Sequence, residues 1–454
     1  MLISLSVLLC SLTLAAAQQV GTLLNETHPR LQWTRCAANE SCETIDGAVV
    51  VDANKRWLHE VDSYISCYDG NRWNSDICSS AEACTSNCAL EGADYRNYGI
   101  SAANDSISLQ LVTRIDFFRN VDSRLFLMES KNKYQTFTLL GNELAFDVDL
   151  STVECGINSA LYFVAMDADG GQARHPTNKA GAEYGTGYCD ASCPRDLRFV
   201  GGKANIEPWR PSETDRDSGY GHFGACCPEF AVWNSNAHSF SMSSHTCYYE
   251  DYSVCDANDC DLTYVNPEDR YGGYCDPNGC NYNPYRMGNK DFYGKGKEVD
   301  TAKKFTVVTR WAEHKVSQFF IQDSKKIDMP APTWDGIPND NGLTQELCEK
   351  TPAVFAERDY FAERGGWKQH HKALTRPMVL AMSIDVDHSA FNLWLDSSYP
   401  LHQHEQDPDF PGVARGDCQP WENNDPGFVV RQHPNAKVVW SNIRFGPIGS
   451  TVKA

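Results

Sequence analysis

The sequence predicts a large all-β sandwich with elaborate loops. Short segments of strand-forming residues recur along the whole chain, and long segments rich in Gly, Asn, Asp and Pro separate them. Convincing amphipathic helices are few, so we do not expect helices to build the core. A length of 454 residues suggests more than one domain, but large β-sandwiches often form a single domain. We therefore expect one domain over residues 18–454.

Nine segments carry the strand signal, and each is rich in β-branched, aromatic or aliphatic residues. In chain order they are GAVVVD (47–52), SISLQLVT (106–113), RLFLME (124–129), QTFTLLG (135–141), LAFDVDL (144–150), ALYFVAM (160–166), FTVVTRW (305–311), PMVLAMSIDV (377–386) and AKVVWSNIRF (436–445). Several of the loops between them carry paired cysteines. Neither internal repeats nor low-complexity tracts interrupt this pattern.

The chain opens with an apolar run, MLISLSVLLCSLTLAAAQQ, that ends in three consecutive alanines. Small residues at this place are the pattern that a signal peptidase cuts. A transmembrane helix fits worse, because the run is too short and no second apolar span of about 20 residues follows. We expect residues 1–17 to be a signal peptide and the protein to be secreted. Three glycosylation sequons, at Asn25, Asn39 and Asn104, agree with an extracellular location.

The cysteine count fits the same compartment. Loss of residues 1–17 removes Cys10, one of the 19 cysteines, and leaves 18. An even number in an oxidising compartment predicts complete pairing into disulfides. Metal binding is the alternative for the Cys84/Cys88 and Cys189/Cys193 pairs, but no His pair follows at zinc-site spacing. The sequence thus predicts no metal site, and it carries no cofactor signal.

The charge of the chain narrows the choice of partner. The formal net charge is −20, and the Lys/Arg clusters that nucleic acid or an anionic membrane requires are absent. A neutral polymer fits better. Aromatic residues make up 11% of the chain, which permits stacking on the apolar faces of sugar rings without proving it.

One short stretch combines rigidity with a carboxylate. Residues 226–236 read CCPEFAVWNSN, so Glu229 follows two adjacent cysteines and begins a run of strand-forming residues. A disulfide-pinned strand would hold this carboxylate rigidly. The next acidic residue along the chain is Glu250. Serine-hydrolase, nucleotide-binding and dinucleotide motifs are all missing, so those classes of function have no support.

Six segments together resemble one family across essentially the whole mature chain. They are CYDGNRW (67–73), FTLLGNELAFDVDL (137–150), ALYFVAMDADGG (160–171), GAEYGTGYCDASCPRDLRFVGGKANIE (181–207), RYGGYCDPNGCNYNPYRMGN (270–289) and SNIRFGPIGST (441–451). The chain is similar to glycoside hydrolase family 7, the retaining cellobiohydrolases and endoglucanases of fungi. The resemblance implies a concanavalin-like jelly-roll sandwich whose disulfide-braced loops form a cleft or tunnel for one β-1,4-glucan chain, such as cellulose. It also implies a monomer.

The resemblance implies a disulfide pattern as well. It pairs all 18 cysteines of the mature chain, for example Cys189 with Cys227, Cys193 with Cys226, and Cys155 with Cys418. One further bridge of the family is missing, because Ala89 stands where a second cysteine would follow Cys88.

The catalytic motif departs from the family pattern. The family has Glu-x-Asp-x-x-Glu after the paired cysteines: a nucleophile, an assisting Asp and an acid/base. This chain has Glu229, Ala231 and Asn234 at those places. Only the nucleophile is kept, and His245 is expected beside it. Loss of general acid/base help typically costs about 10²- to 10⁴-fold in rate.

The cleft implied by the resemblance is largely kept. The positions expected in or beside it are Trp57, Asn158, Tyr162, Asp190, His245, Arg270, Arg286, Trp394 and Arg415. Three positions depart, because Lys55 and Asp385 stand where tryptophans are usual and Ser192 replaces a glutamine. The loops at 207–225 and 247–270 are long enough to favour a covered tunnel.

Two functions follow from this pattern. The first is a secreted glucan-binding protein on a cellobiohydrolase scaffold, with hydrolysis lost or strongly impaired. The second is a working retaining glucanase with a relocated acid, for which Asp385 is the candidate. The first is preferred, since drift after selection for hydrolysis relaxed also accounts for Asp385.

Overall fold

The structure is a computed structural model that describes residues 18–39, 41–115, 118–257, 259–260, 273–400, 409–420 and 425–452. The expected signal peptide at 1–17 and the expected site residue Arg270 lie outside these ranges. Part of the expected covering loop at 247–270 also lies outside them.

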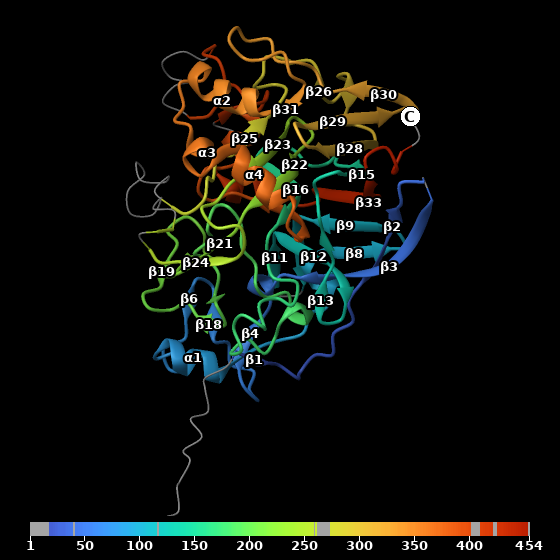
Figure 1. Cartoon of the computed structure of the whole chain (residues 1–454). Helices are drawn as coiled ribbons and strands as arrows, with labels where there is room; N and C mark the ends of the chain where they lie inside the picture. Colours follow the sequence, from blue (N-terminus) through green and yellow to red (C-terminus); the bar gives the residue numbers. More distant parts are fainter. Residues whose placement is uncertain are drawn as a thin grey trace, which may run out of the picture.

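The larger part of the chain forms two hydrogen-bonded layers of strands (Figure 1). The first layer is antiparallel throughout. Its strands, in spatial order, are β25 (Cys280–Tyr282), β23 (Phe240–His245), β22 (Glu229–Ser235), β16 (Ile157–Val164), β32 (Met378–Val386), β12 (Ser123–Ser130), β3 (Cys42–Val51) and β2 (Arg30–Cys36). The short strands β13 (Lys133–Tyr134) and β14 (Thr136–Phe137) extend the pairing of β12 and β32.

The second layer packs beneath the first. Its main strands, in spatial order, are β8 (Ile100–Ala103), β9 (Ser106–Gln110), β33 (Lys437–Pro447), β15 (Asn142–Asp149), β28 (Phe305–Ala312) and β29 (Lys315–Gln322). β30 (Lys325–Asp328) and β31 (Gly342–Leu343) pair with β29. A two-residue parallel contact between β2 and β33 joins the two layers at one edge.

The core between the layers is aromatic. Trp233 of β22 stacks on Phe240 with ring centroids 4.6 Å apart, and Phe230 meets Trp311 of β28 edge-on at 5.5 Å. Trp440 of β33 is also fully buried. Large rings that cross the gap between sheets bury much apolar area and fix the strand register. This packing fixes the strand that carries the catalytic-motif positions.

All nine segments with a strand signal contain strand, so the expected all-β sandwich is confirmed. The segment at 135–141 forms only the two residues of β14. The sequence signal missed β2 and β29, whose apolar residues are interrupted by several polar ones.

Short helices lie outside the two layers. They are α1 (Ala81–Asn87), α2 (Gln345–Val354), α3 (Tyr360–Glu363), α4 (Gly366–Leu374), α5 (Leu393–Asp396) and α8 (Pro426–Gln432). Figure 1 shows α2, α3 and α4 grouped at one end of the molecule, away from α1. No helix in the described ranges is both long and apolar enough to cross a membrane.

Small two- and three-stranded pieces brace the loops. They are β1 (Gln19–Val20) with β7 (Cys88–Leu90) and β4 (Leu58–Glu60), β5 (Tyr68–Asp69) with β6 (Arg72–Trp73), β10 (Val112–Ile115) with β11 (Phe118–Val121), β17 (Phe199–Val200) with β18 (Lys203–Ala204), β19 (Arg210–Pro211) with β20 (Gly219–Tyr220), β21 (Gly224–Cys226) with β24 (Ser253–Cys255), and β26 (Tyr293–Gly294) with β27 (Val299–Asp300).

Every cysteine in the described ranges is in a disulfide, and there are nine of these bonds. The three pairs named from the resemblance, 189–227, 193–226 and 155–418, are all present. Complete pairing of this kind is typical of proteins from oxidising compartments. The 193–226 and 189–227 bonds anchor the segment directly before Glu229.

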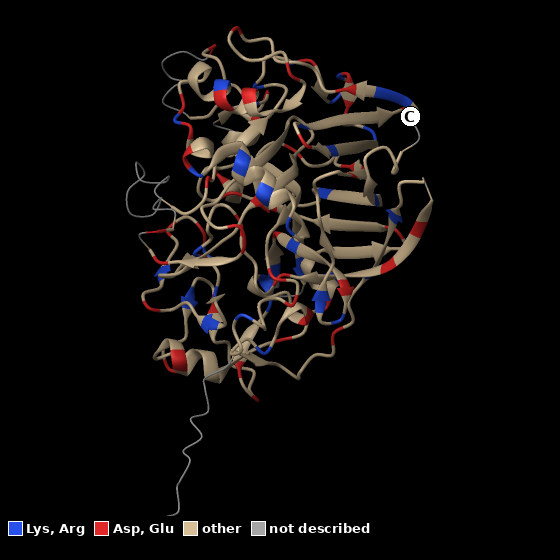
Figure 2. Ribbon diagram, in the orientation of Figure 1, with Lys and Arg blue, Asp and Glu red and all other residues tan. Residues whose placement is uncertain are grey.

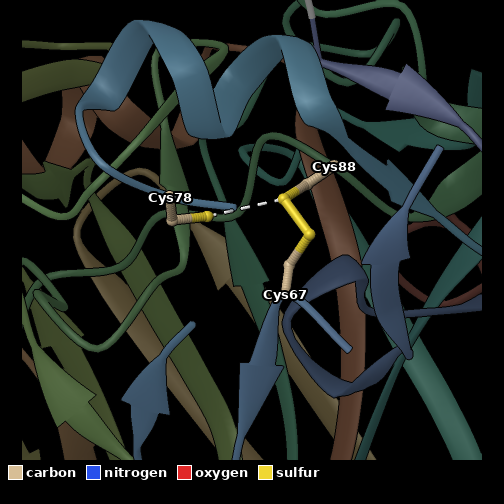
Figure 3. A group of neighbouring side chains, drawn as sticks. All are labelled: Cys67, Cys78 and Cys88. Carbon is tan, nitrogen blue, oxygen red and sulfur yellow. Dashed lines mark hydrogen bonds between the residues drawn. A yellow bond between two sulfur atoms is a disulfide. The ribbon is translucent and has the colours of Figure 1, made fainter. Parts of the chain in front are cut away.

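Three cysteine sulfurs near α1 lie as close together as metal ligands do. Figure 3 shows Cys67 bonded to Cys88, with the sulfur of Cys78 3.5 Å from that of Cys88. Cys78 is itself bonded to Cys84. Metal ligation requires free thiolates, so this cluster is a double disulfide brace.

Charged residues are distributed over the whole molecule. Figure 2 shows Lys and Arg interspersed with the more numerous Asp and Glu on both the strands and the loops. A nucleic-acid surface instead gathers Lys and Arg on one face.

Candidate functional site

A break in the regular alternation of β22 brings the two key positions to one face. Glu229 and Asn234 are five residues apart, so strict alternation of side chains would place them on opposite faces. The pairing of β22 with β23 shifts register between Ala231 and Asn234. This bulge adds one residue and turns Asn234 back to the face of Glu229. Both side chains consequently line the same cavity.

The cavity has a volume of about 1020 Å³ and runs across the first sheet. Its floor is formed by β23, β22, β16, β32 and β12. Ten of the expected site residues line it: Asn158, Tyr162, Asp190, Glu229, Asn234, His245, Arg286, Asp385, Trp394 and Arg415. Residues from six separate regions of the chain are thus brought together in one place.

Glu229 is the first residue of β22, and its carboxyl is ionisable. One oxygen of its carboxyl accepts a hydrogen bond from the backbone N–H of Ala191 at 3.3 Å. Burial and the negative charge of Asp190 raise the pKa of Glu229 to about 8. Asp190 itself accepts hydrogen bonds from the hydroxyl groups of Tyr188 at 2.7 Å and Ser192 at 2.6 Å. The raised pKa favours the protonated form of Glu229, and a protonated carboxyl is a poor nucleophile.

His245 pairs with Glu229 in the register of β23 and β22. Its Nδ1 donates to the carbonyl oxygen of Asp276 at 3.0 Å, so Nε2 accepts from the hydroxyl of Ser243 at 2.7 Å. Burial lowers the pKa of His245. The ring is thus a fixed neutral imidazole with no proton to donate towards the cavity.

Asn234 lies near the other end of β22, where the neighbouring side chains are neutral. Its side-chain oxygen accepts a hydrogen bond from Nδ2 of Asn158 at 3.3 Å. Its partners in the strand register, Ala160 and Ser241, carry no charge. No carboxyl is hydrogen-bonded to Asn234 within the described ranges, so an amide stands where the resemblance implies the acid/base.

Ala231 lies between these two ends. It pairs with Tyr162 on one side and Ser243 on the other, and both of these neighbours line the cavity. Ala231 itself is fully buried and does not line the cavity. Its methyl group offers Glu229 no hydrogen bond. The carboxyl that the resemblance implies at this place would have fixed the rotamer of the nucleophile.

Asp385 lies on β32, on the far side of β16 from β22. It pairs with Asn158 in the strand register and accepts a hydrogen bond from the hydroxyl of Ser383 at 3.1 Å. Burial and the charge of Asp122 raise the pKa of Asp385 to about 7. Lys55 reaches Asp122 at 4.0 Å. A polar, ionisable wall therefore occupies the place where the resemblance implies tryptophans.

Another part of the cavity wall is built on a buried ion pair. Arg286 and Arg415 both donate to one oxygen of Glu357, Arg415 at 3.2 Å. Burial alone would raise the pKa of Glu357, but the two guanidinium groups lower it. Trp394, in α5, lines the cavity and is partly exposed. An aromatic face and fixed donors are the groups that bind sugar rings and their hydroxyls.

The loop between β19 and β20 reaches one wall of the cavity. Nδ1 of His388 donates to the carbonyl oxygen of Thr214 at 2.9 Å. The neighbours of His388 in the chain, Asp387 and Ser389, line the cavity. The first of the two expected covering loops therefore touches the wall formed after β32.

Trp57 is not among the residues that line this cavity. Its ring stacks on Tyr64 at 6.2 Å and lies 4.3 Å from His59, and its N–H donates to Ser66. Lys55, which lies two residues before Trp57, does line the cavity. Arg270, the remaining expected residue, lies outside the described ranges.

Several cavity residues were not expected from the sequence. Arg124 stacks over Tyr188 at 3.4 Å and pairs with Asp52 at 2.6 Å. Ser241 lies directly opposite Asn234. Alternation along β23 from His245 through Ser243 to Ser241 was the signal that would have revealed Ser241. Arg124 and Tyr188 carry no comparable signal.

The fold and the cavity define a β-sandwich protein with a large cavity across one sheet. A family model described as glycosyl hydrolase family 7 matches residues 20–452. The chain belongs to this family.

Solved structures give the same result. The chain is 55% identical to a cellobiohydrolase from Melanocarpus albomyces complexed with cellotetraose, with 96% of this chain and 100% of that chain covered and a TM-score of 0.92. A family 7 cellobiohydrolase from Daphnia pulex is 40% identical with the same coverage and TM-score. The Humicola insolens endocellulase EGI is 32% identical, again at 96% and 100% coverage, with a TM-score of 0.79.

Proposed function

We propose that this protein is a secreted glucan-binding protein that holds a single β-1,4-glucan chain, with hydrolysis lost or strongly impaired. The observation that carries the proposal is the amide of Asn234, hydrogen-bonded to Asn158, where a retaining hydrolase needs its acid/base. Nine disulfides and the family membership support the extracellular location.

Retaining hydrolysis requires two carboxyl groups about 5 to 5.5 Å apart. One attacks the anomeric carbon, and the other protonates the departing oxygen and later activates water. The amide of Asn234 has no proton to transfer at neutral pH. Ala231 leaves Glu229 without its assisting group, and the raised pKa of Glu229 disfavours the carboxylate that would attack. The two substitutions and the raised pKa all act against the same reaction.

Binding has retained more of its groups than catalysis has. Six substrate-binding positions that match the family line one continuous cavity, including the Trp394 ring and the Arg286 and Arg415 guanidinium groups. The similar cellobiohydrolase from Melanocarpus albomyces was solved with cellotetraose. A short cellulose chain is therefore the ligand class that we propose for this cavity.

The alternative of a relocated acid at Asp385 meets a geometric difficulty. Asp385 pairs with Asn158, whereas Glu229 pairs with Val164, six residues further along β16. Six residues of strand span about 20 Å. Extended side chains do not close that separation to the distance of about 5 to 9.5 Å that paired glycosidase carboxyls need.

The deciding experiment measures binding and cleavage in parallel. Cellohexaose is incubated at high protein concentration with protein from a cellulase-free host, and Glu229→Gln is the paired control. We expect saturable binding by calorimetry and no product above the control. Product that disappears in the control would overturn the loss of hydrolysis, and absence of binding would overturn the glucan ligand.

A further inference from the structure

We propose that Asn158 is a positioning residue that holds Asn234 with its NH₂ group towards the cavity. In this orientation Asn234 and Ser241 together bind the oxygen of an intact glycosidic bond. This inference rests on the proposed function, since it names what the protein recognises at the place where cleavage would occur.

The orientation of Asn158 is set by the backbone. Its Oδ1 accepts a hydrogen bond from the backbone N–H of Ser235 at 3.1 Å. A backbone N–H can only donate, so the oxygen of the Asn158 amide must face it. Asn158 is only 6% exposed, which leaves little room for the amide to turn over. Its Nδ2 must therefore point the other way, towards Asn234.

Asn158 in turn sets the orientation of Asn234. Nδ2 of Asn158 donates to Oδ1 of Asn234 at 3.3 Å. A flipped Asn234 would place two NH₂ groups against each other, with no acceptor between them. Nδ2 of Asn234 has no hydrogen-bond partner within the described ranges, and the residue lines the cavity. The site thus presents a fixed donor.

Ser241 supplies a second donor to the same place. It pairs directly with Asn234 across β22 and β23, so the two side chains are neighbours on one face. Ser241 is 5% exposed and lines the cavity, and its hydroxyl makes no hydrogen bond in the described part of the chain. Ser243, two residues further, differs because its hydroxyl is already engaged with His245.

These donors match an ether oxygen. A glycosidic oxygen has lone pairs and no hydrogen, so it can only accept hydrogen bonds. The NH₂ group of Asn234 and the hydroxyl of Ser241 offer two donors and no charge. Such a pair holds the linkage without protonating it, whereas an acid at residue 234 would transfer a proton to it. The recognised class is therefore the uncut chain rather than its hydrolysis products.

The test compares cellohexaose with a thio-linked cellohexaose in which sulfur replaces every glycosidic oxygen. Sulfur is a weak hydrogen-bond acceptor, whereas the hydroxyl groups of the two compounds are the same. Affinities are measured by calorimetry on full-length protein carrying Glu229→Gln, so that neither compound is consumed. We expect the oxygen-linked compound to bind about three- to tenfold more tightly, which is the usual worth of one such hydrogen bond.

Asn158→Asp is the decisive variant. A carboxylate keeps the hydrogen bond from Ser235 but faces Asn234 with a second oxygen, so Asn234 turns and presents its oxygen to the cavity. We expect the preference for the oxygen-linked compound to disappear. Ser241→Ala, which is sterically mild, should reduce that preference by about threefold. Asn142→Asp, the same change on β15 outside the lining of the cavity, should leave it unchanged.

The outcomes separate this inference from the function on which it rests. Failure to bind either compound would overturn the proposed function. Tight binding of both compounds with equal affinity would overturn the recognition of the glycosidic oxygen alone. A preference that survives Asn158→Asp would overturn the role of Asn158. Thermal unfolding of each variant verifies that it is folded.

Discussion

β22 is only seven residues long, yet its two ends differ in chemistry: one carries an ionisable carboxyl and the other a neutral amide. At Glu229 the strand carries a half-buried carboxyl, and the charge of Asp190 and the fixed neutral imidazole of His245 lie close to it. At Asn234 it meets only neutral groups, the amide of Asn158 and the hydroxyl of Ser241. The Glu229 end thus has an ionisable carboxyl, whereas the Asn234 end has only neutral hydrogen-bonding groups.

This difference shows how the sheet accommodates Ala231 and Asn234 in place of the carboxyl groups that the family motif has there. Removing one partner of a buried charged pair leaves the other charge unsatisfied, which is destabilising. Here Asn234 is a neutral amide with a hydrogen bond, and burial raises the pKa of Glu229, which favours its uncharged form. Neither end of the strand therefore requires a charged partner at the other.

The largest effect is expected when both ends of β22 carry a carboxyl group. Ala231→Asp combined with Asn234→Glu should raise cellohexaose hydrolysis by about 10²-fold or more, because it restores the acid/base and the group that assists Glu229. Product release is measured by chromatography, and Ala231→Asp alone is the control. An unchanged rate would mean that the substitutions at Lys55, Ser192 and Asp385 have also disabled the sugar-binding subsites.

The ability of Glu229 to act as a nucleophile can be tested without a proton donor at residue 234. Aryl cellobiosides with good leaving groups need no proton donor, so Glu229 should cleave them at least about tenfold faster than it cleaves cellohexaose. Because the carboxylate attacks and its pKa is raised to about 8, the rate should increase as pH rises towards 8. Release of the phenol is followed by absorbance. Equal inertness towards both substrates, or a rate unaffected by Glu229→Gln, would show that this end is unproductive.

The proton on Glu229 should also be visible in stability. Its pKa is about 8 when folded against 4.5 as the ordinary value, so between these values the native state binds one proton more than the unfolded state. Stability from this group is full at low pH and is lost as pH rises through that interval. Glu229→Gln should therefore reduce the fall in Tm between pH 5 and pH 8 by about 1 to 3 °C. A fall of the same size in both proteins would contradict a proton-holding Glu229.

The smallest effect is expected at Asp385. If it is not an acid for Glu229, Asp385→Asn should change any release of product from cellohexaose by less than about twofold, which corresponds to under about 0.5 kcal/mol. Product is measured by chromatography at fixed pH and high protein concentration, because cleavage of cellohexaose, unlike that of an aryl cellobioside, needs a proton donor. A tenfold loss would restore the relocated-acid alternative and show that the side chains approach each other more closely than the strand register allows.

Much of the architecture was predictable from local patterns. Segments such as 144–150 and 160–166 carry enough apolar and β-branched residues to predict strands, and both form them. The even number of mature cysteines predicted complete pairing, which was confirmed. The pairs themselves came from the resemblance, because spacing alone permits many connectivities.

Local sequence patterns did not predict two helices and several side-chain contacts. α2 was missed because its sequence is weakly amphipathic and contains a proline, and α4 was missed because its amphipathic pattern lasts only nine residues. The stacking of Trp57 on Tyr64 was not predicted, because nothing in the residues around Trp57 indicates that contact. The position of the Ser241 hydroxyl beside Asn234 follows from the pairing of β22 with β23.

Composition, cysteine number and motifs can be counted along the chain, so they were enough to predict the class of fold, the number of disulfides and the altered residues at 231 and 234. Which of those residues meet depends on contacts between distant segments. The bulge that turns Asn234 to the face of Glu229 depends on pairing with β23, and the donor orientation of Asn234 depends on Asn158 from a distant segment. Register and hydrogen-bond direction arise between strands, so they cannot be read along one of them.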